Sequence, residues 1–143
     1  MSDKRRLYRT GLLTLLVLAL VAVLVGAAAD APETLLGYAM YETAATPEAP
    51  VTERLGDVPA GHLSKLYVLA EGRGTGLAEA LVHDGVERLR RLGFRHVWLG
   101  TNAQNARANR FYERLGFATI GARQFVVGGE RVEDDWVRLL TVA

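Results

Sequence analysis

Three closely spaced glycines constrain this chain more than any other feature. The stretch LYVLAEGRGTGLAEAL, Leu66 to Leu81, runs from a strand-like segment through Gly72, Gly74 and Gly76 into an apolar helical pattern. Glycine costs roughly 0.5–1 kcal/mol relative to alanine inside a regular element, so this spacing predicts a backbone that bends sharply or lies close to something. A strand, a glycine turn and a helix N-terminus form an anion site, because free amide N–H groups and the helix dipole act at the same place.

Three glycine motifs build such sites, and spacing separates them. The phosphate loop of nucleotide hydrolases needs GxxxxGK followed by Ser or Thr, which this chain lacks. A dinucleotide fold needs GxGxxG, and the order Gly72, Gly74, Gly76, Leu77 does not meet it. The third motif is Arg or Gln, two residues, Gly, one residue, then Gly or Ala, and RGTGLA (Arg73 to Ala78) matches it residue for residue.

Composition indicates one folded domain and excludes several kinds of site. With 143 residues, of which 50% are apolar and 23% charged, the chain can bury a core. A formal net charge of +1 gives no overall attraction to nucleic acid, and the arginines of DGVERLRRLGF are interspersed with acids, as on a solvated helix face. The chain has no cysteine, and His62, His83 and His96 lack metal-ligand spacing, so we expect no metal.

The remaining sequence alternates between strand and helix patterns. The predicted strands lie at 33–43, 62–70, 96–101 and on either side of Gly128-Gly129, and the predicted helices at 76–92 and 102–117. Gly93 and Gly116 are in the positions expected to end the two helices. The proline-rich segment 44–61 predicts a loop with at most a short turn of helix. The predicted fold class is α/β, a mixed central sheet with flanking helices and a C-terminal antiparallel hairpin.

A second motif follows the glycine turn after one helix and one strand. From Asn105 to Phe117 the chain reads N-x-x-A-x-x-F-Y-E-x-x-G-F. With both motifs in this order, the chain resembles the GNAT superfamily of N-acetyltransferases over about residues 37–143. The resemblance implies acetyl-CoA as co-substrate and no metal.

The resemblance also implies a place for each part of acetyl-CoA. Its pyrophosphate would sit on the amides of Arg73 to Ala78, and its pantetheine arm would pair with the main chain of Leu66 to Val68 as an added strand does. The Val68 amide would polarise the thioester carbonyl. The implied cofactor-binding residues are Leu66, Tyr67, Val68, Arg73, Gly74, Thr75, Gly76, Leu77, Ala78 and Asn105. The implied catalytic residue is Tyr112, as the acid that protonates the CoA sulfur.

The base that this chemistry needs is not identified by the sequence. An alkyl amine has a pKa of about 10.4 and is mostly protonated at pH 7, so a base must remove a proton before attack. Many N-terminal acetyltransferases of the family place a glutamate five residues before the Asn105 equivalent, where this chain has Gly100. Glu42, an acid near Asp134, or a chain of waters remain as candidates.

The end of the chain bears on the acceptor. FVVGGERVEDDWVRL is similar to the late strand of polyamine and small-amine acetyltransferases. Asp134 and Asp135 would attract a cationic amine, and the alternative is that both are solvated turn charges. The expected acceptor is a primary amine of a small molecule or a peptide.

The N-terminus departs from the family pattern. Residues 10–29 carry no charge, follow KRRLYR, and just reach the roughly 20 residues of a membrane span; they also fit the outline of a secretory signal. A span would consume residues 21–29, remove the sheet strand expected there and send the domain away from cytosolic acetyl-CoA. The preferred interpretation is therefore an atypical apolar segment at 1–20 and a cytoplasmic acetyltransferase domain at 21–143. The alternative is an anchor through residues 10–29.

Two functions follow from these observations. The first is an active cytoplasmic N-acetyltransferase that works by direct attack of the amine. The second is an acetyl-CoA-binding domain with weak or no turnover, attached to a membrane or dimerised through its apolar N-terminus.

Overall fold

The structure is a computed structural model that describes residues 35–127 and 130–143. The strands are β1 (Gly37–Glu42), β2 (Ala60–Val68), β3 (His96–Asn102), β4 (Ala118–Val127) and β5 (Glu130–Thr141). The helices are α2 (Ala49–Leu55), α3 (Leu77–Arg91) and α4 (Ala106–Arg114), with a 3-10 turn at Ala70–Gly72. The predicted apolar segment at 1–20, the strand expected before β1 and the Gly128-Gly129 turn lie outside the described residues.

The five strands form one sheet in the order β1-β2-β3-β5-β4. β2 and β3 are parallel, and the other neighbours are antiparallel. β4 and β5 pair from Val127↔Glu130 to Ala118↔Leu139 and make the C-terminal hairpin. The predicted mixed α/β sheet with an antiparallel hairpin at one end is confirmed.

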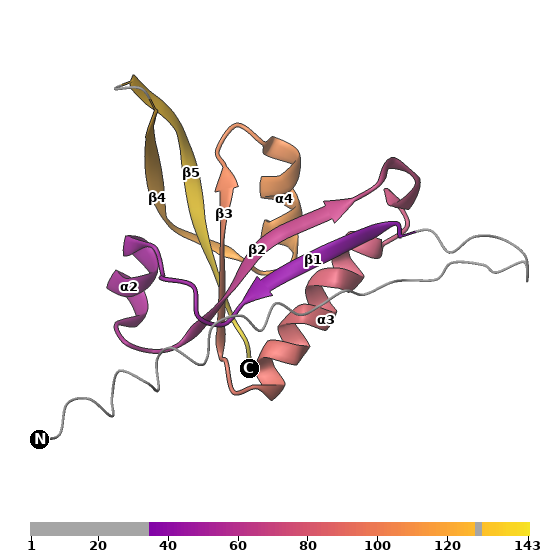
Figure 1. Ribbon diagram of the computed structural model, residues 1–143, viewed down its shortest axis with the longest axis horizontal. Helices are drawn as coiled ribbons and strands as arrows, with labels where there is room; N and C mark the ends of the chain where they lie inside the picture. Colours follow the sequence, from indigo (N-terminus) through magenta and orange to yellow (C-terminus); the bar gives the residue numbers. More distant parts are fainter. Residues whose placement is uncertain (1–34, 128–129) are drawn as a thin grey trace, which may run out of the picture.

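β2 and β3 separate soon after they meet. They pair only at Ala60↔His96, Gly61↔Val97 and His62↔Trp98, although both strands continue for several residues. Figure 1 shows β2 and β3 diverging towards their C-terminal ends, with α4 beside the opening. His62 and Trp98 therefore form the last pair before the divergence, and we call this point the apex.

Side chains alternate between two cores on opposite faces of the sheet. Val97 and Leu99 point to the core under α3 and α4, whereas Trp98 points to a second core with Val51 of α2 and Val137 of β5. Figure 1 shows α3 running along β1 and β2, and α2 beside β4 and β5. The segment predicted as a loop with a short turn of helix contains α2, with a proline in its first turn.

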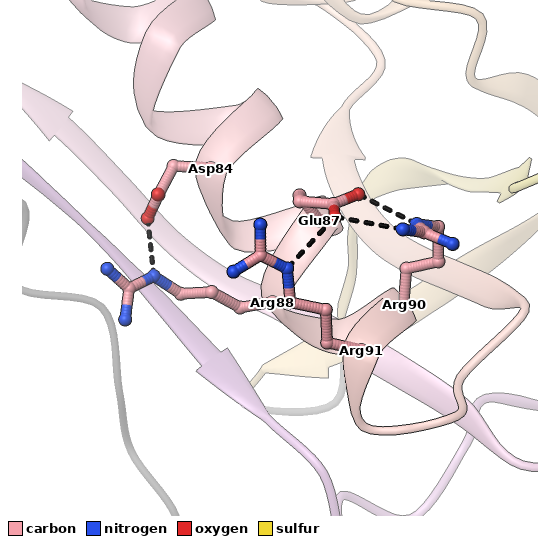
Figure 2. Close-up of polar contacts among 5 residues, drawn as sticks. All are labelled: Asp84, Glu87, Arg88, Arg90 and Arg91. Atoms are coloured by element: carbon pink, nitrogen blue, oxygen red, sulfur yellow. Dashed lines mark hydrogen bonds and ion pairs between the residues drawn. The ribbon is translucent and has the colours of Figure 1, made fainter.

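Helix α3 forms where the apolar spacing predicts it. Its buried residues include Leu81, Val82 and Leu89, and Gly93 follows its end with a φ of 93°. The outer face carries Asp84–Arg88, Glu87–Arg90 and Glu87–Arg91 ion pairs at 2.6, 2.7 and 3.0 Å (Figure 2). Hydrogen bonds from the two arginines lower the pKa of Glu87 to about 2. The prediction of a solvated helix face is confirmed.

The apolar run at residues 10–29 lies outside the described residues. Within the part of the chain that the structure describes, no helix is both long and apolar enough to cross a membrane.

Candidate functional site

A cavity of about 740 Å³ lies between the C-terminal half of β2, the glycine turn and helix α4. Its lining consists of Leu66, Tyr67, Val68, Gly72, Arg73, Gly74, Gly76, Leu77, Ala78, Glu79, Asn105, Arg107, Ala108, Arg110, Phe111, Tyr112 and Arg114. Every site residue expected from the sequence lines this cavity except Thr75. Two motifs that are far apart in the sequence therefore meet around one space.

The backbone of β2 presents polar groups towards the opening. The Leu69 amide donates to the Leu36 carbonyl at 2.7 Å, and Val68 pairs with Gly37 next to them. Along an antiparallel ladder, hydrogen-bonded residue pairs alternate with pairs that are not hydrogen-bonded. Because Leu69 and Leu36 form a hydrogen-bonded pair, Val68 and Leu66 occupy pairs with β1 that are not hydrogen-bonded. Their N–H and C=O groups therefore face the side from which β3 has diverged. An extended ligand can pair with them as an added strand does.

The glycine turn depends on left-handed backbone. Gly74 and Gly76 have φ values of 75° and 82°, and a Cβ at either position would meet nothing within 4 Å. Glycine is therefore required by the left-handed backbone conformation and not by a lack of space for a side chain. The space in front of both residues is open. The hydroxyl of Thr75 donates to the Gly72 carbonyl at 2.6 Å, within the turn. This bond braces the turn and accounts for the absence of Thr75 from the cavity lining.

The N-terminus of α3 faces the cavity with unbonded amides. The Ala80 amide donates to the Gly76 carbonyl at 3.0 Å and closes the first turn of the helix. The amides of Ala78 and Glu79 precede that bond and have no intrahelical acceptor. Both residues line the cavity, so the positive end of the α3 dipole is directed at a ligand there.

Arginines dominate the charge around the cavity. Arg73, Arg107, Arg110 and Arg114 line it, with Glu79 as the one acid among the described lining residues. The three arginines of α4 were not among the residues expected from the sequence. They are spaced by three and four residues, which places them on one face of the helix. This spacing is the sequence pattern from which they could have been predicted. A cavity lined in this way favours a polyanionic ligand.

Two asparagines hold the segment that joins β3 to α4. Asn105 caps α4 by accepting a hydrogen bond from the Ala108 amide at 3.0 Å, so the helix begins four residues later than predicted. The amide group of Asn109 donates to the carbonyls of Asn102 and Asn105 at 3.0 and 2.9 Å. Its oxygen accepts from Arg138, which is 2% exposed, at 3.0 Å. These contacts fix the position of α4 relative to the sheet.

Tyr112 is held between two aromatic rings at the cavity. Phe111 and Phe117 contact it edge-on, with ring centroids 5.1 and 5.7 Å away. Burial raises the pKa of Tyr112 to about 12. The phenol therefore stays protonated near pH 7, as a proton donor must.

Arg123 explains why residue 100 is a glycine, at the position where some members of the family have a glutamate. A Cβ on Gly100 would lie 2.7 Å from the Arg123 guanidinium, which fills the space above it. Arg123 forms ion pairs with Glu48 and, at 3.0 Å, with Asp135. Asp135 is therefore neither a solvated turn charge nor a carboxylate left open to a cationic amine.

The structure offers no metal-binding cluster in the part of the chain that it describes. In residues 35–127 and 130–143, no three or more His, Asp or Glu side chains gather closely enough to hold a metal ion. The cavity chemistry consists of backbone amides, arginines, the Glu79 carboxylate, the partly buried Tyr112 phenol and the exposed Tyr67 phenol.

Known relatives match this chain over part of their length. The Acetyltransferase (GNAT) family model matches residues 14–117. An uncharacterized N-acetyltransferase of Mycobacterium bovis is 44% identical over 82 residues, which cover 57% of this chain and 52% of the relative. A mycothiol acetyltransferase of Parafrankia is 40% identical over 91 residues, which cover 58% of this chain and 28% of the relative. The chain spans about half the length of the first relative and less of the second.

Solved structures agree on the fold. Arabidopsis thaliana NAA60 in complex with a bisubstrate analogue matches with a TM-score of 0.66 at 22% identity, covering 77% of this chain and 66% of that one. The NatC complex bound to Gag peptide and CoA matches with a TM-score of 0.62 at 21% identity, covering 80% of this chain and 65% of that one. The family match over residues 14–117 covers well over half of the 143 residues and confirms the resemblance seen in the sequence. This chain belongs to the Acetyltransferase (GNAT) family.

Proposed function

We propose that this chain is an acetyl-CoA-dependent N-acetyltransferase that acts on a primary amine of a small molecule or a peptide. One observation carries the proposal: the strand edge, the glycine turn and the arginine-lined helix surround a single cavity. Each of the three matches a different part of acetyl-CoA. Family membership supports the same donor, and the reaction needs no resident metal.

The phosphates bind at the glycine turn and α4 in this proposal. Within the turn from Arg73 to Ala78, the amides that have no bond inside the protein receive the pyrophosphate, with the α3 dipole behind them. The Arg73 amide itself donates to the Ala70 carbonyl at 3.2 Å. Arg107, Arg110 and Arg114 supply positive charge for the further phosphate of CoA. Thr75 stabilises the turn through its hydrogen bond to Gly72 and does not itself contact the phosphates in this proposal.

The pantetheine arm lies along β2 towards the apex. Main-chain groups of Leu66 and Val68 pair with its amides, and Tyr67 lies between them on the cavity wall. The side chain of Asn105 uses its oxygen as the α4 cap, which leaves its NH₂ group for the arm. The Val68 amide is the donor proposed for the thioester carbonyl.

The reaction is a direct transfer. The amine nitrogen forms a bond to the thioester carbonyl carbon while the carbon–sulfur bond breaks. A base receives the proton that the amine loses, and Tyr112 protonates the departing thiolate, because its raised pKa keeps it a donor. The products are an acetamide and CoA.

The acceptor is proposed only as a class. The NatC structure is described as bound to Gag peptide, and the NAA60 structure holds a bisubstrate analogue. The Gag peptide in the NatC structure supports a peptide amine. The mycothiol acetyltransferases among the relatives are named for mycothiol and not for a peptide. Both a small amine and a peptide amine therefore belong in the first assays.

The location proposed is the cytoplasm, where acetyl-CoA is available. The family match starts at residue 14, inside the apolar run. This supports a domain that takes in part of that run rather than an anchor over 10–29, and it starts the domain earlier than the division into 1–20 and 21–143 that the sequence pattern favoured.

Turnover of Tyr112→Phe tests the proposal. The full chain is incubated with acetyl-CoA and a panel of amines, and release of the CoA thiol is followed. We expect the parent to turn over and Tyr112→Phe to lose about 10²–10⁴-fold in kcat with unchanged acetyl-CoA affinity, because only the proton donor is removed. Binding without turnover in the parent would instead support the second candidate, an acetyl-CoA-binding domain.

A further inference from the structure

Helices α3 and α4 each carry a run of arginines, but the two runs have different surroundings. On α3 each arginine of the run forms an ion pair with an acid of its own helix, with N···O distances of 2.6 to 3.0 Å (Figure 2). On α4 the run consists of Arg107, Arg110 and Arg114, which we call the α4 arginine row. All three line the cavity, and none of them forms an ion pair with another residue that the structure describes.

The single acid of α4 does not neutralise the row. That acid is Glu113, and its carboxylate accepts from Arg138 of β5, a guanidinium that is 2% exposed, at 3.0 Å. Like charges three and four residues apart on a helix repel each other. Arg107 also lies in the first turn of α4, where the positive end of the helix dipole disfavours a cation. Both effects are relieved when an anion binds to the row.

A cavity with positive charge on two separate elements fits a ligand with two separate phosphate groups. The glycine turn and the N-terminus of α3 are the proposed site of the pyrophosphate. CoA carries one further phosphate, a monoester on its ribose, with about 1.5 to 2 negative charges at pH 7. The guanidinium group of arginine presents several donors in one plane and binds phosphate oxygens in pairs. The ribose phosphate is therefore the anion that the α4 arginine row fits.

We propose that the α4 arginine row selects the acetyl donor by its ribose phosphate. The proposal rests on the proposed acetyltransferase function and narrows its donor class to CoA thioesters that carry the 3′-phosphate. The same thioester without that phosphate, acetyl-dephospho-CoA, is discriminated against. A nucleoside 3′,5′-bisphosphate, which has neither the pantetheine arm nor the acetyl group, is itself a ligand of the cavity and competes with acetyl-CoA.

Arg114 is held in place in the free protein. Its guanidinium carbon lies 5.9 Å from the centre of the Phe111 ring, which lines the cavity and packs against the core under α3. A guanidinium over an aromatic face has lost part of its conformational freedom, so less remains to be lost when a phosphate binds. Arg107 lies about 10 Å away along the helix axis. The row thus presents positive charge along the side of the cavity that α4 forms.

Two donors that differ only in the ribose phosphate test the proposal. Isothermal titration calorimetry gives the dissociation constants of acetyl-CoA and acetyl-dephospho-CoA at 50 mM and 500 mM KCl. The test variant combines three substitutions on α4, namely Arg107→Gln, Arg110→Gln and Arg114→Gln. The matched control combines three substitutions on α3, namely Arg88→Gln, Arg90→Gln and Arg91→Gln. The control removes the same charge from a helix face that does not line the cavity (Figure 2).

We expect the parent to bind acetyl-CoA about 10–100-fold more tightly than acetyl-dephospho-CoA at 50 mM KCl, the effect of one hydrogen bond to a charged group. The ratio should fall at 500 mM KCl, because the three arginines are exposed and salt screens their charge. In the α4 variant the ratio should be close to one, mainly through weaker binding of acetyl-CoA. In the α3 control it should match that of the parent.

A measurement on the parent alone covers an α4 variant that fails to fold. Adenosine 3′,5′-bisphosphate should raise the thermal unfolding midpoint of the parent clearly more than the same concentration of adenosine 5′-monophosphate does. Equal shifts, equal affinity of the parent for the two donors, or a folded α4 variant with the parent ratio would overturn the α4 arginine row as the selecting element and leave the acetyltransferase function standing. A parent that binds neither donor would instead overturn the proposed function and the selection with it.

Discussion

Asn109 is predicted to be the side chain on which the position of α4 depends. Its NH₂ group has two hydrogens and lies within reach of the carbonyls of Asn102, Ala103 and Asn105, and its oxygen accepts from the buried Arg138. A neutral hydrogen bond contributes a net 0.5–1.5 kcal/mol and a bond to a charged group about 1.5–3 kcal/mol. Two of the first kind and one of the second give roughly 2.5–6 kcal/mol for Asn109→Ala. Against a total stability of about 5–15 kcal/mol, this loss is a sixth or more.

Urea denaturation of the full chain measures this loss, and Gln104→Ala is the control. Gln104 lies in the same turn, and its side chain is exposed, so its removal should change the free energy of unfolding by less than about 0.5 kcal/mol. At a temperature where Asn109→Ala is still folded, its acetyl-CoA affinity should also fall, because Asn105 and Tyr112 lie on the displaced segment. A loss of stability below about 1 kcal/mol would refute the reasoning that this network fixes α4.

The remaining predictions concern packing and pH. Gly85→Ala should destabilise the domain by about 1–3 kcal/mol in thermal unfolding, because the new Cβ would lie 2.0 Å from the Tyr41 ring; an unchanged midpoint would show that the ring moves without cost. The pKa of His62 is lowered from 6.5 in the folded state, so below about pH 6.5 the unfolded chain binds more protons and the free energy of unfolding should fall as pH decreases. Urea curves between about pH 5 and pH 8 should show this slope in the parent and a smaller one in His62→Asn; equal slopes would contradict the lowered pKa.

The local parts of the site could be predicted from the sequence. Gly74 and Gly76 adopt left-handed backbone at the start of α3, and both motifs line one cavity, as their types and order indicated. Helix α3 was readable from its spacing, because each buried residue lies three or four positions from another. These features depend on neighbours along the chain, so a sequence pattern records them directly.

The apex could not be predicted in the same way. Nothing in the sequence of β2 or β3 marks their separation after His62↔Trp98, because strand divergence depends on what packs between the strands. The stacking of the His62 and Trp98 rings, with centroids 3.8 Å apart, joins residues far apart in the chain. The contact of Arg123 with Gly100 likewise depends on the register of β4 and β5 against β3. The sequence therefore left the base open between Glu42, an acid near Asp134 and a chain of waters, and it gave no sign that Arg123 fills the space above Gly100.

The thermal unfolding midpoint of the full chain, with and without acetyl-CoA, tests the central claim most directly, because it needs no knowledge of the acceptor. Acetyl-CoA at about 100 times its dissociation constant should add roughly 2.7 kcal/mol, which corresponds to an upward shift of about 5–10 °C for a domain of this size. Gly76→Val should abolish the shift, because a branched side chain cannot adopt the φ of 82° that shapes the turn. A folded parent whose midpoint does not move with saturating acetyl-CoA would contradict the assignment of the cavity to this donor.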